Sequence, residues 1–318
     1  MNALLRGVCF VALLSLVTSC AKPVDYSTGT GRILFPFQGV PMAKIRLTAV
    51  DPKSLKLKGY DEIRIHAYTV KVSPSYTARG YLFEGPKTAE TRTGNRILFG
   101  HWLGGVANFD SNEREFFAEA AEYAKEGNVC AIPVGNYPWM TSPTGTAEDI
   151  PLVITQVNDY RIGLNLLFSR AGKRSTKAMV ISHDYGAMFG ILTAVADRRV
   201  GAAVIMAPVS RFYQWNRILR SIPEGKVMDA YRAAMLPYDP ISLIGELSIP
   251  ILFQYAETDQ YVSKTDADAL MNAATSAAKD ERRYHASHAI TQNAEANADR
   301  RAWVEKILSE WNAQSAAE

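Results

Sequence analysis

The chain has 318 residues, of which 47% are hydrophobic and 21% are charged, and its formal net charge is +3. This composition supports a large buried core and excludes a mainly disordered protein. Because the basic residues are scattered along the chain, no nucleic-acid-binding surface is predicted.

The first nineteen residues are typical of a targeting segment. Arg6 precedes a stretch of apolar or small residues, 7–19, that is too short for an ordinary membrane span. The stretch ends in the letters VTSC, which resemble the bacterial lipobox, where the cysteine is lipidated and becomes the new N-terminus. We therefore expect a lipoprotein of the bacterial cell envelope, anchored in the membrane through Cys20. The alternative is a secreted protein cleaved near Ala21.

Residues 20–31 carry Pro, Ser, Thr and Gly without periodicity, which predicts a lipid anchor followed by a short tether. Residues 32–318 are expected to form a single domain. Cys130 is the one cysteine in that domain, so no internal disulfide is predicted. Within residues 32–86, the alternating runs 63–70 and 78–83 predict antiparallel strands at one edge of a sheet.

From residue 96 onward, strand patterns alternate with helix patterns. The expected strands are 96–100, 129–134, 177–182, 202–207, 249–255 and 282–286, and the expected helices are 112–126, 151–169, 185–196, 264–279 and 292–311. This alternation predicts an α/β fold with a mostly parallel, doubly wound sheet covered on both faces. Residues 209–248 interrupt it and are expected to form a small cap. The expected pocket-lining side chains are Trp102, Tyr213, Trp215, Tyr231 and Tyr238.

One strand runs directly into a helix around Asp184. Small residues, Ser182 and Gly186, lie two positions before and two positions after it, which is the spacing of a nucleophile elbow. Such a turn strains its central residue and brings strand and helix close together, so the flanking residues must be small. The alternative is that Asp184 only caps the helix that begins at Tyr185.

The sequence SHDYG at 182–186 resembles the Gly-His-Asp-x-Gly elbow of haloalkane dehalogenases and epoxide hydrolases, within the α/β-hydrolase superfamily. The resemblance covers roughly residues 96–313 and implies the α/β-hydrolase fold. In those relatives the aspartate attacks an sp3 carbon and forms an alkyl ester, which a histidine-activated water then hydrolyses. A carboxylate suits this attack because it is ionised at neutral pH.

The order nucleophile, acid, histidine in that superfamily points to two further residues. Asp259 follows the strand 249–255 and is the expected acid, with Glu257 as the alternative. His288 follows the strand 282–286 and is preferred over His285 as the catalytic histidine. Asp259 would accept a hydrogen bond from the His288 ring and fix its orientation. A structural role is expected for His183.

The sequence HWLGG follows the strand 96–100, where this fold supplies an oxyanion amide. The backbone amides of Trp102 and Tyr185 are the expected pair; the alternative is that the glycines mark an ordinary tight turn. Trp102 and Gly104 depart from the His-Gly-x-Pro pattern of the relatives. Tyr185 and Leu103 stand where dehalogenases place halide-binding Trp and Asn, which disfavours dehalogenation.

The sequence thus predicts a hydrolase with an Asp nucleophile that acts on a small, largely apolar substrate. Epoxide opening is the leading reaction, with cap tyrosines as donors to the leaving oxygen. One alternative is an esterase or lactonase in which His288 activates water directly; another is an inactive, surface-tethered binding lipoprotein. No metal-ligand spacing or phosphate-binding glycine loop is present, so neither a metal nor another cofactor is expected.

Overall fold

The computed structural model describes residues 26–27, 29–37, 39–86, 94–104, 112–170, 176–220 and 224–317. The predicted targeting segment and Cys20 lie outside these residues. Across the described ranges, no helix combines the length and the apolar character needed to cross a bilayer.

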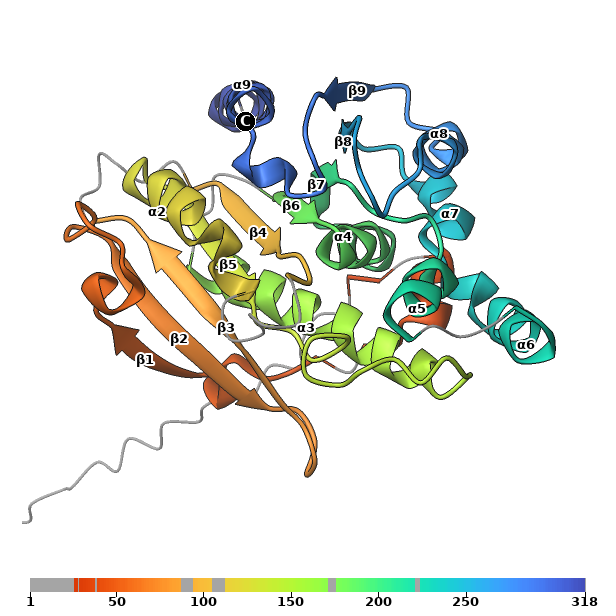
Figure 1. Cartoon of the computed structure of the whole chain (residues 1–318). Helices are drawn as coiled ribbons and strands as arrows, with labels where there is room; N and C mark the ends of the chain where they lie inside the picture. Colours follow the sequence, from red (N-terminus) through yellow and green to blue (C-terminus); the bar gives the residue numbers. More distant parts are fainter. Residues whose placement is uncertain are drawn as a thin grey trace, which may run out of the picture.

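Nine strands of the described chain form one sheet in the order β1-β2-β3-β5-β4-β6-β7-β8-β9 (Figure 1). The strands are β1 Arg46–Val50, β2 Arg64–Lys71, β3 Thr77–Glu84, β4 Arg96–Gly100, β5 Val129–Pro133, β6 Ala178–His183, β7 Val200–Met206, β8 Ile251–Ala256 and β9 Lys279–Tyr284. Strands β1, β2 and β3 pair in antiparallel fashion, as does β3 with β5, and the other pairs are parallel. The mostly parallel sheet with antiparallel N-terminal strands is therefore confirmed.

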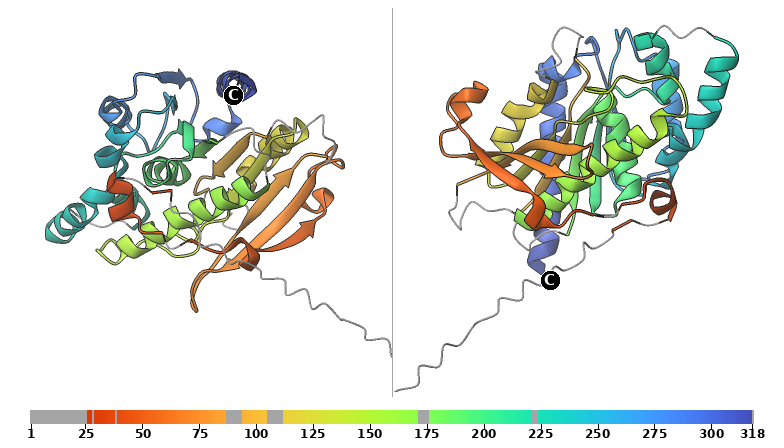
Figure 2. Two further views of the ribbon diagram at one scale, coloured as in Figure 1. Left: turned by 180° about the vertical axis from the view of Figure 1, so that it is seen from behind. Right: turned by 90° about the horizontal axis from the view of Figure 1, so that it is seen from below.

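Helices cover both faces of this sheet (Figure 2). They are α1 Gly29–Leu34, α2 Phe117–Lys125, α3 Asp149–Arg170, α4 Tyr185–Ala196, α5 Phe212–Arg220, α6 Lys226–Met235, α7 Pro240–Leu243, α8 Lys264–Ala273 and α9 Ala294–Ala317. Successive side chains of a strand point to opposite faces. In β6, Ala178 and Val180 pack into the core with α3 and α4, whereas Met179 and Ile181 pack into the core with α2 and α9.

The N-terminal part of the domain differs from the prediction. A tether was expected to reach residue 31 and a strand region to start at 32, but residues 29–34 form α1, which packs against the end of α4. A Cβ atom on Gly31 would lie 2.3 Å from the carbonyl oxygen of Val195. Arg161 is fully buried and donates from Nη1 to the Phe35 carbonyl at 3.0 Å. These contacts hold the segment against the domain, so the folded part begins before residue 32.

The connection between α8 and β9 also differs, because the helix expected over 264–279 ends at Ala273. The hydroxyl of Thr275 donates to the Gly245 carbonyl at 2.6 Å, and that of Ser276 donates to the Ile249 carbonyl at 2.7 Å. These long-range bonds favour a non-helical connection despite the alanine-rich sequence. Strand β9 consequently starts at Lys279 instead of residue 282.

Candidate active site

Asp184 lies in the sharp turn between β6 and α4. Its φ of 59° and ψ of −124° are strained for a residue with a side chain, and such strain is concentrated at functional sites. The side chain is 1% exposed and makes no capping hydrogen bond to α4. The alternative that Asp184 merely caps the helix is therefore wrong.

The small residues around Asp184 are required by close approaches of the backbone. A Cβ atom on Gly186 would lie 2.2 Å from the Gly100 carbonyl oxygen, and one on Gly190 would lie 2.3 Å from the Ser182 hydroxyl. Helix α4 therefore packs against β4 and β6 more closely than larger residues permit. This packing holds the elbow at the carboxyl ends of the parallel strands.

The loops after β8 and β9 bring Asp259 and His288 together. Oδ2 of Asp259 is 2.9 Å from Nδ1 of His288, and Oδ1 accepts hydrogen bonds from the Tyr261 and Val262 amides at 2.8 Å and 3.0 Å. Glu257, the alternative acid, is 53% exposed and lies 3.7 Å from His285. His285 is itself 88% exposed, so this second pair sits at the surface.

His288 is held between two carboxylates. Its Nε2 lies 3.7 Å from Oδ1 of Asp184, which is longer than a hydrogen bond, so this contact is an electrostatic one. Burial acts to lower the pKa of His288, but Asp184 and Asp259 outweigh it and raise the pKa to about 10. Burial acts to raise the pKa of Asp259, but the hydrogen bond and charge of His288 bring it below its usual value. The charges of the two carboxylates therefore favour the protonated form of the His288 ring.

The loop after β4 points one backbone amide at the elbow aspartate. The N–H of Leu103 donates to Oδ2 of Asp184 at 2.9 Å. The N–H of Trp102, which was the predicted oxyanion donor, instead donates to Oε2 of Glu115 at 2.7 Å. The amide that faces Asp184 is thus that of Leu103 and not that of Trp102, because the local turn sends successive amides to different partners. The amide of Tyr185 opens α4, where the helix itself offers no carbonyl partner.

Glu115 is a further carboxylate of this region that no sequence pattern indicated. Its Oε1 lies 2.6 Å from Nδ1 of His183 and accepts from the Thr291 hydroxyl at 2.9 Å. Nε2 of His183 lies 2.9 Å from the carbonyl oxygen of His288. The ring of Trp102 stacks on His183 with the centroids 5.5 Å apart. Glu115 approaches the elbow only through the tertiary packing, which explains why sequence analysis missed it.

Aromatic rings surround the histidine. Trp215 stacks on Tyr185 at a centroid distance of 5.4 Å and presents its ring edge-on to His288 at 5.7 Å. Tyr261, which was not predicted, lies 5.0 Å from the His288 ring. The sequence did offer a signal for Tyr261, because it follows Asp259, the expected acid, by two residues in the same loop. Of the predicted cap aromatics, Trp215 contacts the candidate catalytic residues.

Tyr213 occupies a different face of α5 and needs a correction. Phe212, Trp215 and Asn216 are buried, as expected for residues three or four apart on one helix face. Tyr213 instead packs its ring under the guanidinium of Arg232 at 4.4 Å. Tyr213 and Trp215 are two residues apart, and residues at this spacing lie on different faces of a helix. Predicting a helix over this segment would therefore have separated the two rings.

Tyr231 and Tyr238 have partners other than Asp184, Asp259 and His288. The Tyr231 hydroxyl is buried and donates to Oδ2 of Asp149 at 3.0 Å, which joins α6 to the start of α3. The Tyr238 ring packs edge-on against Phe35, next to α1, with the centroids 6.0 Å apart. Both rings join parts of the domain, and their lining of a substrate pocket stays a prediction.

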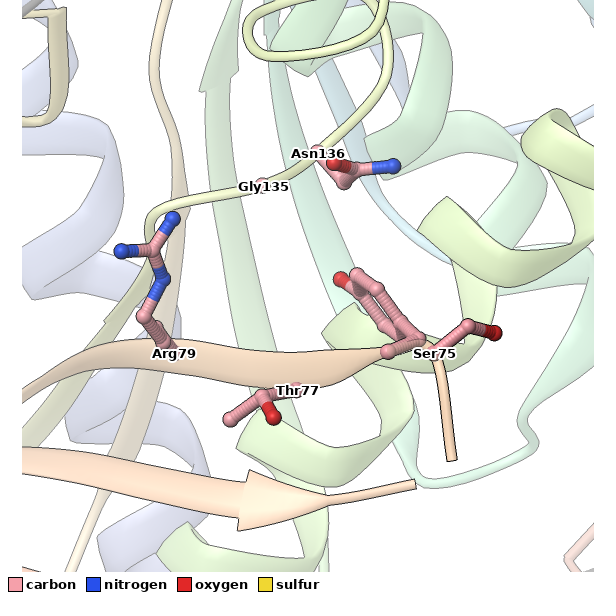
Figure 3. A pocket seen from close by; sticks show the side chains of 6 residues that line it. Ser75, Thr77, Arg79, Gly135 and Asn136 are labelled. Atoms are coloured by element: carbon pink, nitrogen blue, oxygen red, sulfur yellow. The ribbon is translucent and has the colours of Figure 1, made fainter. Parts of the chain in front are cut away.

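A separate polar pocket of about 330 Å³ lies at the end of β5 and the start of β3 (Figure 3). None of its lining residues belongs to the loops that carry Asp184, Asp259 or His288. It is lined by Ser75, Tyr76, Thr77, Arg79, Gly135 and Asn136. Figure 3 shows Arg79 and Asn136 on either side of Gly135. Over the ranges that the structure describes, no three His, Cys, Asp or Glu side chains are grouped to hold a metal ion.

Comparison with known proteins adds similarity of fold. No protein-family model and no curated protein sequence match this chain. An acetyl xylan esterase from Paenibacillus sp. R4 superposes with a TM-score of 0.63 and 13% identity, covering 91% of this chain and 96% of that one. Acetyl xylan esterase 1 from Thermoanaerobacterium sp. JW/SL YS485 gives 0.62 and 14%, covering 90% and 96%. An esterase from Pyrococcus furiosus gives 0.57 and 11%, covering 84% and 96%. The chain has the α/β-hydrolase fold.

Proposed function

We propose that this protein is a hydrolase whose nucleophile is Asp184. The observation that carries the proposal is the hydrogen bond from the Leu103 amide to Oδ2 of Asp184. When water attacks an aspartyl ester, the negative charge develops on the carbonyl oxygen of the aspartate itself. A backbone amide that already donates to this oxygen is placed to stabilise that negative charge. A serine-type mechanism would instead need the amide for an oxygen of the substrate.

In the first half of the proposed reaction, Oδ1 of Asp184 attacks an electrophilic sp3 carbon. The bond from this carbon to the leaving oxygen breaks, and the electron pair stays on that oxygen. The phenol of Tyr185 and the indole N–H of Trp215 are buried and have no hydrogen-bond partner in the described part of the chain. They take the place of the expected cap tyrosines as candidate donors to the leaving oxygen.

Esterification removes the negative charge of Asp184, one of the two charges that raise the pKa of His288. The pKa of the histidine then falls, and the proton it releases balances the proton taken up by the leaving oxygen. His288 thereby becomes a base at the stage where one is needed.

In the second half, neutral His288 takes a proton from water, and the hydroxide attacks Cγ of Asp184. Negative charge develops on Oδ2 beside the Leu103 amide. The bond between Cγ and Oδ1 then breaks, and Oδ1 leaves with the product as a hydroxyl by taking the proton of the added hydroxide, while His288 keeps the proton it took from water. One oxygen of the regenerated carboxylate therefore comes from water, and the product of the first turnover carries an enzyme oxygen.

Epoxides are the proposed substrate class, because the leaving oxygen of an opened epoxide takes up the proton that His288 releases. Ester hydrolysis with Asp184 as a supporting group is the second candidate, and the similar solved structures named as esterases favour it. In that reaction His288 would have to deprotonate water in the resting site, where the two carboxylates keep it protonated. The hydrogen bond from the Leu103 amide to Oδ2 of Asp184 counts against an inactive binding protein.

The test uses three variants and a panel of epoxides, haloalkanes and esters. Asp184→Asn is expected to abolish turnover, and His288→Gln is expected to accumulate an adduct seen as added mass on the intact protein. His285→Gln is the matched control, since this exposed histidine lies three residues away. A single turnover in oxygen-18 water separates the two candidates, because only an aspartyl ester places enzyme oxygen in the product. Full turnover by Asp184→Asn would refute the proposal.

We also propose that the mature protein is anchored in the bacterial cell envelope through a lipid on Cys20, which precedes the described residues. The VTSC sequence supports this proposal, and a secreted form is the alternative.

A further inference from the structure

A buried pair, Glu115 and His183, joins three loops of the candidate site. The carboxylate accepts from the Trp102 amide in the loop after β4 and from the Thr291 hydroxyl after β9. It also lies 2.6 Å from the His183 ring at the elbow, which in turn bonds the His288 carbonyl at 2.9 Å. No other described side chain of the site forms hydrogen bonds to all three loops.

The carboxylate of this pair is stabilised in its charged form. Burial acts to raise the pKa of Glu115, but the charge and hydrogen bond of His183, with the bonds from Trp102 and Thr291, bring it below its usual value. Both ring nitrogens of His183 lie at hydrogen-bond distance from an oxygen atom, Nδ1 from Oε1 of Glu115 and Nε2 from the carbonyl of His288. The side chain of Glu115 is 4% exposed and that of His183 is 0% exposed. Removing the partner of a buried hydrogen-bonded group is costly, so each side chain holds the other in place.

Apart from the hydrogen bond from Thr291, each hydrogen bond of the pair lies within one residue of a group in the proposed reaction. Trp102 precedes Leu103, whose amide binds Asp184, and His183 directly precedes Asp184. The carbonyl held by His183 belongs to His288 itself. A shift of the pair would therefore move the oxyanion amide and the histidine relative to the aspartate.

We propose that Glu115 and His183 are positioning residues. They hold the Leu103 amide against Oδ2 of Asp184, and they fix the backbone of His288 so that its ring stays beside Oδ1. The effect on reaction rates that we expect when the pair is lost rests on the function proposed above. The expected movement of the Leu103 amide and of His288 does not.

The two half-reactions depend on this positioning to different degrees. Formation of the ester needs Asp184 and the bound substrate. Hydrolysis of the ester needs the Leu103 amide and His288 in place at the same moment. Loss of the pair is therefore expected to slow ester hydrolysis more than ester formation, so that the adduct accumulates and kcat falls more than KM changes.

The kinetic test compares Glu115→Ala with Glu115→Gln. A displacement of catalytic groups by about 1 Å can cost roughly 100-fold, so we expect ester hydrolysis to slow by about 100-fold in Glu115→Ala. Glutamine can accept from the Trp102 amide and still hydrogen-bond the His183 ring, so it is expected to restore the rate to within about tenfold of the wild type. Equal impairment of the two variants would overturn a positioning role.

Glu84→Ala is the matched control. Glu84 is also a buried carboxylate, 6% exposed, and pairs with Arg170 at 2.9 Å at the end of β3. This variant is expected to lower the melting temperature without slowing ester hydrolysis. The same slowing in Glu84→Ala as in Glu115→Ala would overturn the proposal, because a general loss of stability would then explain both.

Hydrogen exchange of the Leu103 and Trp102 amides tests the positioning without reference to the chemistry. Both amides are expected to exchange about tenfold faster or more in Glu115→Ala and at the wild-type rate in Glu84→Ala. Turnover by Asp184→Asn would refute the proposed function, but this exchange result would still decide the positioning role. If Glu115→Ala does not fold, Thr291→Val removes one donor to Glu115 and is expected to act in the same direction. Unchanged exchange in the folded variant would overturn the inference.

Discussion

Replacing His288 with glutamine should destabilise the protein by an amount that depends on pH. The pKa of His288 is raised from 6.5 to about 10 by Asp184 and Asp259, against the effect of burial. A pKa difference of this size between the folded and unfolded states corresponds to roughly 5 kcal/mol of stability at most. The side chain is 4% exposed, so little of this is screened by solvent.

The sign follows from the direction of the shift. A group whose pKa is raised on folding binds its proton more tightly in the folded state. The contribution of His288 is therefore fully present below about pH 6.5 and is lost as the pH rises to about 10. Across this window, the unfolding equilibrium constants of the wild type and His288→Gln should converge by up to about tenfold per pH unit.

Urea denaturation in buffers from about pH 6 to about pH 10.5 measures this convergence. His285→Gln is the control, because His285 is 88% exposed and its replacement should leave the curve unchanged. Asp184→Asn removes one of the two charges that raise the pKa of His288, so its stability should fall over a narrower pH range. A stability difference between wild type and His288→Gln that stays constant across the window would refute the imidazolium in the resting site.

Three other changes test separate parts of the structure. Gly186→Ala should lower the unfolding free energy by about 1–3 kcal/mol in a denaturation experiment, because its Cβ would lie 2.2 Å from the Gly100 carbonyl; an unchanged value would contradict the close packing of the elbow. Tyr231→Phe should cost about 1–3 kcal/mol because it removes a buried hydrogen bond to Asp149 but should leave turnover intact, and a large loss of turnover would return Tyr231 to the active site. Cys20→Ser should abolish incorporation of a labelled fatty acid and release the protein from the membrane fraction; retention of the label would exclude Cys20 as the anchor.

Much of the fold was predictable because it is encoded locally. Strand β4 and helix α4 have the predicted bounds, since apolar runs and small-residue spacing are properties of adjacent residues. The predictions failed where distant groups compete for the backbone. Arg161 and the end of α4 hold α1, while carbonyls of Gly245 and Ile249 bind the segment that was expected to extend α8.

The same division applies to the candidate site. The sequence by itself determined the elbow at Asp184 and the order in which Asp259 and His288 follow, because a strand that ends in a tight turn onto a helix is readable from a few neighbouring residues. Only the tertiary structure decided that Leu103 rather than Trp102 directs its amide at Asp184, and that Glu115 joins His183. Which atom of a loop points inward depends on the three-dimensional packing around it, and no periodicity along the chain records that direction.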